Sequence, residues 1–274
     1  MTDDSNDPFV VLQPDGPRLP ILISIPHCGT EFPPELQDRF LPEILEYPDD
    51  TDWFVHSLYD FCERHGVTII QSRYSRYVID LNRDPAGQNL YDDGRTETGL
   101  LPDKTFAGAP LYKDGRGPTP CEVEERLLKY FVPYYRKIES VLRELRLTSR
   151  QVMLWDAHSI PRHVPSVRAE PFPDLMLGNQ DGKTAHPKLV ELALAKLSRG
   201  NRFKVANNNP FKGGYITRYF GKPANRVHAL QLEMSQDVYL DPEKGTFDSA
   251  RAERIQPILH DTIMSLAELL RRFP

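Results

Sequence analysis

Short apolar runs recur along the chain, and most of them lack the strict apolar–polar alternation of a half-exposed strand. Such runs are typical of strands that are covered on both faces of a sheet. Amphipathic helical patterns separate the runs, and strands alternating with helices predict an α/β fold with helices on both sides of the sheet. The predicted strands are residues 21–25, 67–70, 77–81, 152–156, 174–178, 203–206 and 228–234.

Four segments carry the helical pattern. Residues 51–65 begin with Thr and Asp and are followed by Gly66, a reasonable stop signal. Residues 120–146 contain Pro133, which should kink or divide the helix because proline cannot donate the backbone hydrogen bond. No internal repeat or linker interrupts the pattern, so we expect one domain over residues 1–274. The other two helical segments are residues 187–199 and 248–272.

Composition narrows the functional classes. The 274 residues are 39% hydrophobic and 27% charged, so a packed core is expected rather than disorder. The net charge is −5, which argues against nucleic acid as the main partner, because phosphate binding requires a basic field. A small anionic substrate remains compatible with the composition, since a few local arginines can override the global sign.

Cysteine usage and the N-terminal segment indicate a cytoplasmic protein. The three cysteines, Cys28, Cys62 and Cys121, form no C-x-x-C pair, so neither a disulfide framework nor a thiolate zinc site is expected. The first 16 residues are acidic and polar, unlike a signal or transit peptide. No apolar run approaches the roughly 18 residues of a membrane span, so no membrane association is expected.

Two histidines follow or end predicted strands. His27 comes directly after the strand at residues 21–25 and Pro26, and His158 follows the strand at 152–156. Ligands of open α/β sheets bind beyond the carboxyl ends of the strands, so the two imidazoles are expected to share a site. Imidazole together with a carboxylate is a ligand set typical of catalytic zinc.

The third ligand should then be an acid, and the sequence offers several. Asp52, Asp50 and Glu31 are all candidates, although an Asp at the start of a helical segment commonly serves as its cap. Asp156 lies two residues before His158 and could orient that imidazole from behind.

A general base is also expected. Glu233 lies in or at the end of the apolar run at residues 228–234, where a carboxylate is costly to bury without a role. A carboxylate beside a metal-bound water can take its proton and pass it to a leaving amine.

Basic residues and glycines supply candidate substrate contacts. Asn82 and Arg83 could hold a substrate carboxylate in forked hydrogen bonds, and Arg76 could face the reacting carbonyl. A further segment, "NPFKGGYITRYFG", offers close backbone approach and positive charge through Lys212, Gly213, Gly214, Tyr215 and Arg218. The long patternless stretches at residues 83–118 and 159–173 are expected to be functional loops.

The sequence gives weaker support to other kinds of catalytic or binding site. Cys28 beside His27, and Ser159 beside His158, are chain neighbours that point to opposite faces of an extended segment. The chain contains no G-x-S-x-G, G-x-G-x-x-G or G-x-x-x-x-G-K-[ST] motif, so neither a serine hydrolase nor a nucleotide site is indicated. The remaining histidines considered, which are not expected to be ligands, are His56, His163, His186, His228 and His260.

Taken together, these segments resemble the N-formylglutamate amidohydrolase family. The matching segments occur in the same order as in that family and cover about residues 20–241. It implies a fold similar to zinc carboxypeptidases (phosphorylase/hydrolase-like), with a mixed, mostly parallel central sheet flanked by helices. The matching segments are "ISIPHCGTEFP", "DTDWFVHSLYDF", "SRYVIDLNRDP", "TGLLP", "LWDAHSIP", "DLMLGNQDG", "NPFKGGYITRYFGKP" and "HALQLEMSQDVYLD".

The resemblance also implies an activity: hydrolysis of N-formyl-L-glutamate to formate and L-glutamate, a step of histidine breakdown, with one Zn²⁺ per chain. The wider carboxypeptidase-like group places its metal ligands on H-x-x-E, but Thr30 stands third after His27 here and Glu31 is one place too far. We therefore take Asp52 as the acid ligand. The roles that follow are metal binding by His27, Asp52 and His158, catalysis by Glu233 and Arg76, and substrate binding by Asn82, Arg83, Arg218 and Tyr215.

Three alternatives remain open. The same chemistry could act on another N-acyl amino or dicarboxylic acid. The chain could instead be a catalytically silent carboxylate-binding protein of the same fold, although all the expected catalytic residue types are present. A metallopeptidase acting on peptide ends is disfavoured because the H-x-x-E motif is missing.

Overall fold

A mixed, mostly parallel sheet forms the centre of the computed structural model, which describes residues 7–91 and 97–273. The described strands lie in the order β1-β3-β2-β4-β7-β5-β6. Strands β3, β2, β4 and β7 run parallel, whereas β1 is antiparallel to β3 and β5 is antiparallel to β7. The strands are β1 (Phe9–Leu12), β2 (Ile21–Ile25), β3 (Thr68–Ser72), β4 (Val152–Ile160), β5 (Leu175–Gly178), β6 (Val205–Asn207) and β7 (Val227–Ser235).

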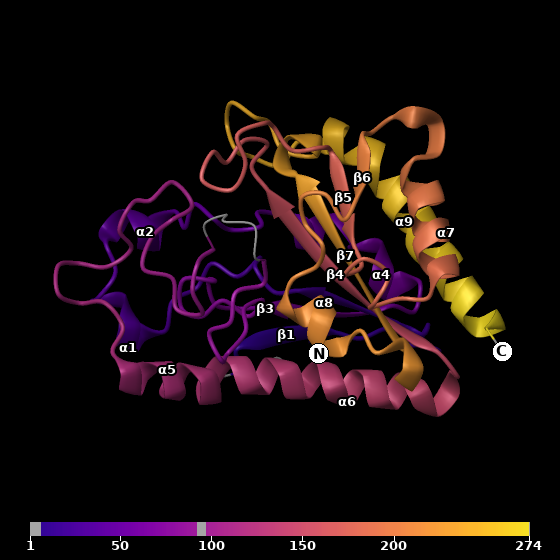
Figure 1. Ribbon diagram of the computed structural model, residues 1–274, viewed down its shortest axis with the longest axis horizontal. Coiled ribbons are helices and arrows are strands. Elements are labelled where there is room, and N and C mark those ends of the chain that lie inside the picture. Colours follow the sequence, from indigo (N-terminus) through magenta and orange to yellow (C-terminus); the bar gives the residue numbers. More distant parts are fainter. Residues whose placement is uncertain (1–6, 92–96, 274) are drawn as a thin grey trace.

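Helices cover both faces of this sheet, as expected for an α/β fold (Figure 1). One face carries α3 (Val55–Leu58), α4 (Phe61–Arg64), α7 (Pro187–Leu197) and α9 (Ser249–Arg272), and the other carries α6 (Val132–Thr148) and α8 (Tyr215–Phe220). Among the described residues, no helix is long and apolar enough to cross a membrane. The remaining helices are α1 (Pro34–Gln37), α2 (Pro42–Glu46), α5 (Pro120–Arg126) and short 3₁₀ turns at Arg199–Asn201, Pro223–Asn225 and Gln236–Val238.

The side chains of β4 and β7 alternate between two environments. Met153, Trp155, Leu230 and Leu232 join the apolar core beneath α7 and α9. The residues between them face the layer of α6 and α8, because successive side chains of a strand point to opposite faces. Along each strand this second face changes from apolar to polar toward the carboxyl end.

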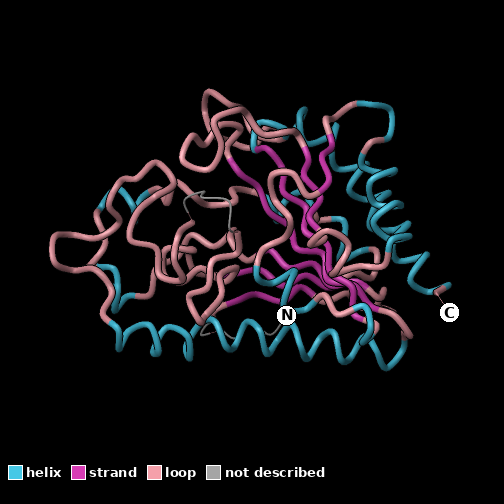
Figure 2. Tube along the Cα trace, in the orientation of Figure 1, coloured by secondary structure: helices cyan, strands magenta, loops and turns pink. Residues whose placement is uncertain are grey.

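Loops gather beyond the carboxyl ends of the parallel strands (Figure 2). They include the expected stretches at 159–173 and at 83–118, of which residues 92–96 lie outside the described residues. Because ligands of such sheets bind at this edge, these loops are placed to enclose a site.

Two predicted elements differ in the structure. Residues 77–81 form buried turns rather than a strand, since Val78 N–H bonds Ser75 and Asp80 N–H bonds Leu100 instead of a neighbouring strand. The helix expected at 51–65 is divided into α3 and α4, and Phe54 adopts a left-handed conformation before α3. The amino-terminal strand β1 is an addition to the predicted strands.

The helix expected at 120–146 is divided, as its proline predicted. A π-helical segment at Leu127–Phe131 separates α5 from α6, and Pro133 follows it directly. Proline lacks the N–H of the regular helical pattern, and a π-bulge accommodates that loss. All described strands belong to one sheet, and a single domain over residues 1–274 stays a prediction.

Candidate active site

Three neighbouring parallel strands deliver the central residues of the site. His27 follows β2, His158 lies within β4, and Glu233 lies opposite His158 in β7. Strand β4 is longer than predicted and extends to Ile160, so His158 belongs to the strand itself, like Asp156, rather than to the loop after it. Their alternation places both side chains on the face toward α6 and α8.

His27, Asp52 and His158 form a compact buried cluster. One ligand atom from each lies within 4.8 Å of the other two. Asp52 Oδ2 is 3.0 Å from His158 Nδ1 and 3.8 Å from His27 Nδ1. Ligands of a tetrahedral zinc ion lie roughly 3.3 Å apart, given metal–ligand distances of about 2.0–2.2 Å. The three residues therefore fit a small divalent cation.

An aspartate carboxylate also lies close to the Nε2 atom of each imidazole. His27 Nε2 is 2.7 Å from Asp80 Oδ1, and His158 Nε2 is 3.2 Å from Asp156 Oδ1. Within the described chain, Asp156 Oδ1 has no hydrogen-bond partner, while Asp156 Oδ2 accepts from the Thr217 hydroxyl. A histidine that binds metal through Nδ1 carries its proton on Nε2 and usually donates it to a carboxylate or carbonyl. Asp80 is placed to receive that proton from His27, whereas His158 Nε2 also faces the NH₂ group of Asn82 at 3.0 Å, which can only donate.

The charges of the cluster reinforce this interpretation. Burial favours the neutral form of His158, but Asp156 and Asp52 outweigh it and raise the pKa of His158 well above its usual range. Burial and the nearby Arg76 lower the pKa of His27. Asp156 and Asp52 place excess negative charge around His158, and a bound cation would neutralise that charge.

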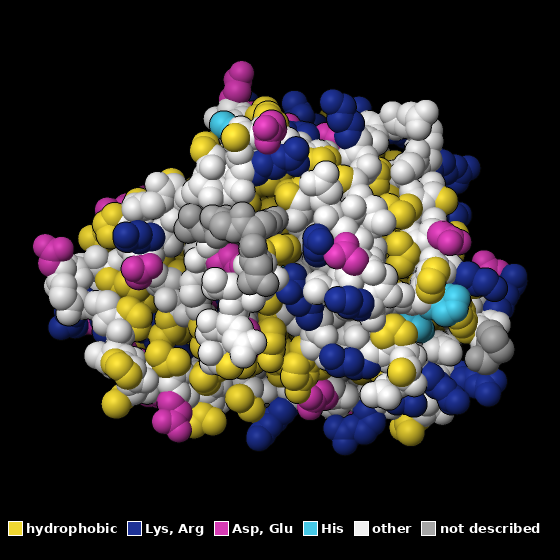
Figure 3. All heavy atoms as spheres, in the orientation of Figure 1, with side chains coloured by type: hydrophobic (Ala, Val, Ile, Leu, Met, Phe, Trp, Pro, Cys, Tyr) yellow, Lys and Arg dark blue, Asp and Glu magenta, His cyan; other side chains and the backbone are white. Residues whose placement is uncertain are grey.

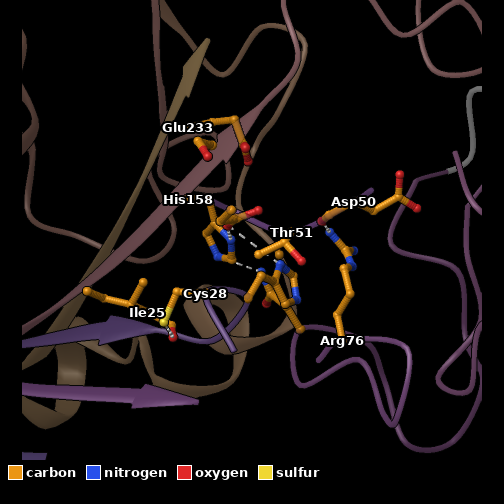
Figure 4. A network of polar contacts seen from close by, with 12 residues as sticks. Ile25, Cys28, Asp50, Thr51, Arg76, His158 and Glu233 are labelled. Atoms are coloured by element: carbon orange, nitrogen blue, oxygen red, sulfur yellow. Dashed lines mark hydrogen bonds and ion pairs between the residues drawn. The ribbon is translucent and has the colours of Figure 1, made fainter. Parts of the chain in front are cut away.

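The structure distinguishes the three candidate acids. Asp52 contacts both histidines and does not cap a helix, because α3 begins at Val55 without a side-chain cap. Asp50 is directed elsewhere, and its Oδ2 accepts from Phe106 N–H at 2.8 Å (Figure 4). Glu31 is exposed and lies 3.7 Å from Arg73.

Glu233 lies at the edge of this cluster and faces the same pocket (Figure 4). Its side chain is buried, and burial, opposed by His158, raises the pKa of Glu233 to about 8. A carboxylate with a raised pKa is suited to accept a proton near neutral pH and later to return it.

Arg76 is the buried cation of the site. Its guanidinium donates to Asp80 Oδ2 at 2.6 Å and lies over the ring of Phe106 at 4.8 Å. Burial opposes its charge, but Asp80 and Asp52 raise the pKa of Arg76 above its ordinary value. The side chain lines the pocket, so a permanent positive charge faces any bound ligand.

Asn82 and Arg83 also line the pocket, but both are engaged by the protein. Asn82 Oδ1 accepts from Ile216 N–H, and its Nδ2 lies 3.0 Å from His158 Nε2. Arg83 donates to the carbonyl and hydroxyl of Thr98. Asn82 thus contacts a histidine of the cluster as well as the pocket.

The glycine-containing segment before α8 reaches the pocket only in part. Gly214 lines it, whereas Tyr215 and Arg218 are not among the described residues that do so. Arg218 donates to Gly213 and Leu90 carbonyls and lies over the ring of Tyr91, which does line the pocket. Lys212 N–H bonds the Tyr91 hydroxyl. Lys212 and Arg218 therefore support a pocket wall through Tyr91 and Leu90, whereas Gly214 lines the pocket itself.

The pocket has an empty volume of about 660 Å³, including its open mouth. Its polar lining comes from β4 and β7 and from the segments that follow β2 and β3, and its apolar wall comes from the two long loops, the end of β4 and the segment before α8. Lys and Arg side chains are prominent on the α6 and α8 side of the molecule (Figure 3), so the net charge of −5 does not describe this face. The apolar wall residues are Leu90, Phe106, Ile160, Val167 and Phe211.

Sequence reasoning missed two buried polar residues that bond His27, Arg76 or Glu233. Asp80 is fully buried and bonds both His27 and Arg76, and Gln231 bonds Glu233. The signals were present: Asp80 is an acid inside an apolar run, and Gln231 precedes Glu233 by two residues and so shares its face of the strand.

The disfavoured nucleophiles are held away from the histidines. Cys28 Sγ contacts the Ile25 carbonyl, and burial raises the pKa of Cys28 to about 12, so its thiol stays protonated. The Ser159 hydroxyl bonds Tyr239 rather than His158. Neither pair forms a nucleophile–base dyad.

A buried His–Asp–His cluster beside a glutamate, at the carboxyl edge of an α/β sheet, is an arrangement typical of hydrolases. Comparison with known families agrees with this class. The model of the N-formylglutamate amidohydrolase family matches residues 19–240, and the chain belongs to this family.

Similar curated proteins and solved structures carry the comparison further. The N-formylglutamate deformylases of Pseudomonas aeruginosa and Pseudomonas putida are 38% and 37% identical to this chain, with coverage of 91% of it and 93% and 92% of their own lengths. The crystal structure of an N-formylglutamate amidohydrolase from Ralstonia eutropha superimposes with a TM-score of 0.80 at 28% identity, covering 97% of this chain and 98% of its own. A gene product of Agrobacterium tumefaciens shares the fold with a TM-score of 0.72 at 15% identity and the same coverage. The α/β fold with a mixed sheet is thereby confirmed.

Proposed function

We propose that this chain hydrolyses the formamide bond of N-formyl-L-glutamate, producing formate and L-glutamate, with one Zn²⁺ held by His27, Asp52 and His158. The observation that carries the proposal is the buried cluster itself, whose three ligand atoms lie within 4.8 Å of one another. The 38% identity to an N-formylglutamate deformylase over 91% of the chain supports the choice of substrate.

A zinc ion in this cluster would lower the pKa of bound water and polarise a carbonyl. His27 binds as a neutral ligand with its Nε2 proton donated to Asp80, and His158 loses a proton when the metal binds, with Asp156 beside its Nε2 atom. Glu233 removes a proton from the attacking water and delivers it to the nitrogen of the leaving amine. Arg76 stabilises the negative charge that develops on the formyl oxygen, and its pairing with Asp80 holds it in place for that role.

The substrate is a dianion, and the pocket contains permanent cations to receive it. Arg83 with Asn82 is proposed for one carboxylate, and reaching it requires Arg83 to exchange part of its contact with Thr98. The contact of Arg218 and Tyr215 with the other carboxylate stays a prediction, since neither lines the pocket in the described chain. The cytoplasmic location and the role in histidine breakdown also remain predictions.

Formate release from purified protein tests the proposal. We expect turnover of N-formyl-L-glutamate, about one zinc per chain, and loss of activity on chelation that zinc restores. A panel of N-acetyl-, N-succinyl- and N-formyl-amino acids provides the comparison. A metal-free sample with full activity would overturn the zinc mechanism. Faster turnover of another N-acyl acid would identify that compound, rather than N-formyl-L-glutamate, as the substrate. Binding of glutamate without any turnover would favour a catalytically silent binding protein.

A further inference from the structure

Gln231 occupies an unusual position for a glutamine in the middle of a strand. It is only 4% exposed, lines the pocket, and lies opposite Asp156 in the register of β4 and β7. Both ends of its amide are used. Its Oε1 accepts from Gly214 N–H at 2.6 Å, and its Nε2 donates to Glu233 Oε2 at 3.1 Å.

The contact with Gly214 fixes which way the amide points. A backbone N–H can only donate, so the atom of Gln231 that faces Gly214 must be the carbonyl oxygen. The opposite atom is then the NH₂ group, and it must face the carboxylate of Glu233. The orientation therefore follows from the partners and not from an arbitrary choice between nitrogen and oxygen.

The backbone that supplies this N–H is itself held in place. A Cβ on Gly214 would overlap the Asn82 amide, and Asn82 Oδ1 accepts from Ile216 N–H two residues later. Gly214 is thus packed tightly against Asn82 at the start of α8. Gln231 spans the distance between this segment and the glutamate on its own strand.

We propose that Gln231 is a positioning residue, which holds Glu233 Oε2 so that the other carboxylate oxygen is presented for proton transfer. In the part of the chain that the structure describes, Gln231 provides the one hydrogen bond to the Glu233 carboxylate. An amide donor also favours the ionised form that a base requires. The role rests on the proposed function, because it requires Glu233 to act as the base.

The first test replaces the amide with an apolar side chain of similar length. Gln231→Met removes both hydrogen bonds, and we expect kcat to fall about 10- to 100-fold, a modest part of the roughly 10²–10⁴-fold that general base catalysis supplies. KM should change less than threefold, and zinc content should equal that of the unchanged protein. The matched control is Gln256→Met in α9, where a part-buried glutamine donates to the Ser57 carbonyl on the opposite face of the sheet. It should leave kcat unchanged.

A double-mutant cycle separates positioning from a general structural effect. In a Glu233→Gln background, Gln231→Met should reduce the residual kcat less than twofold, because the group that it positions is already gone. Gln231→Glu provides a second variant that keeps the acceptor for Gly214 and places a carboxylate beside Glu233. We expect it to lose at least as much activity as Gln231→Met.

The outcomes are distinguishable. Full kcat in both Gln231 variants, loss of zinc, or an equal fold-loss with and without Glu233 would overturn the positioning role. A Glu233→Gln protein with normal turnover would overturn the base assignment and the positioning role with it, while zinc-dependent formate release could stand. If the protein without substitutions released no formate from N-formyl-L-glutamate, the proposed function itself would be overturned.

Discussion

The two faces of β4 and β7 differ sharply although they belong to the same two strands. Toward α7 and α9, the strands present Trp155, Ala157, Leu230 and Leu232, all fully buried in an apolar core. Toward α6 and α8, the alternating residues near the carboxyl ends are polar or ionisable. They are Asp156, His158, Gln231 and Glu233.

The difference shows how one pair of strands serves stability and chemistry at once. Apolar burial on the first face stabilises the fold by about 1.5–3 kcal/mol for each large side chain. Buried ionisable groups on the second face cost free energy unless each has a partner. Here they contact one another, Asp52, Thr217 and the Gly214 backbone, so the cost is distributed over a connected network.

The largest expected effect comes from breaking the polar face. His158→Ala should abolish stoichiometric zinc binding and reduce kcat/KM by at least about 10³-fold, because a metal ligand and its transition-state stabilisation, worth several kcal/mol, are both lost. Metal content by atomic absorption and formate release check this. A His158→Ala protein that keeps zinc and turnover would remove His158 from the site.

A substitution on the apolar face should have the opposite signature. Leu232→Ala, between Gln231 and Glu233 in the chain, should lower the free energy of unfolding by about 2–5 kcal/mol through loss of buried volume. The folded variant should keep its zinc content and its kcat within about threefold. Urea unfolding and steady-state kinetics measure the two effects. A large loss of kcat without a loss of stability would mean that the two faces are not separable.

The smallest expected effect is a pH dependence of zinc affinity. In the metal-free protein the pKa of His158 is raised well above its usual range, so the imidazole is protonated at neutral pH and must lose that proton to bind metal. Zinc affinity should therefore rise with pH, by about tenfold per unit for each proton released. Competition titrations with a zinc indicator between about pH 6 and 8 measure the slope. A flat profile would contradict the protonated state of His158.

Residue chemistry and strand position predicted much of the site. Histidines at strand ends and an acid in an apolar strand are visible in one sequence, and the structure brings His27, His158 and Glu233 together. The choice between Asp50 and Asp52 depended on the backbone between β2 and α3, which local pattern does not determine. The run at 77–81 was read as a strand because buried turns and buried strands have similar composition.

The substrate contacts were harder to predict. Arg218 has the right charge and lies beside two glycines, but its guanidinium is used by the Gly213 and Leu90 carbonyls. Asp80 could have been found by the reasoning applied to Glu233. Which side chain fills a pocket depends on tertiary packing between loops, which sequence spacing does not encode.

The division of the pocket between strands and loops suggests a route for engineering. His27, His158, Gln231 and Glu233 lie on or soon after β2, β4 and β7, whereas Leu90, Phe106, Val167 and Phe211 come from segments outside the sheet. Randomising Leu90, Val167 and Phe211 would vary the shape of the cavity, whereas Phe106 is best kept because its ring packs against the Arg76 guanidinium. Libraries of this kind could therefore be screened for hydrolysis of bulkier acyl amides while the sheet remains a constant scaffold.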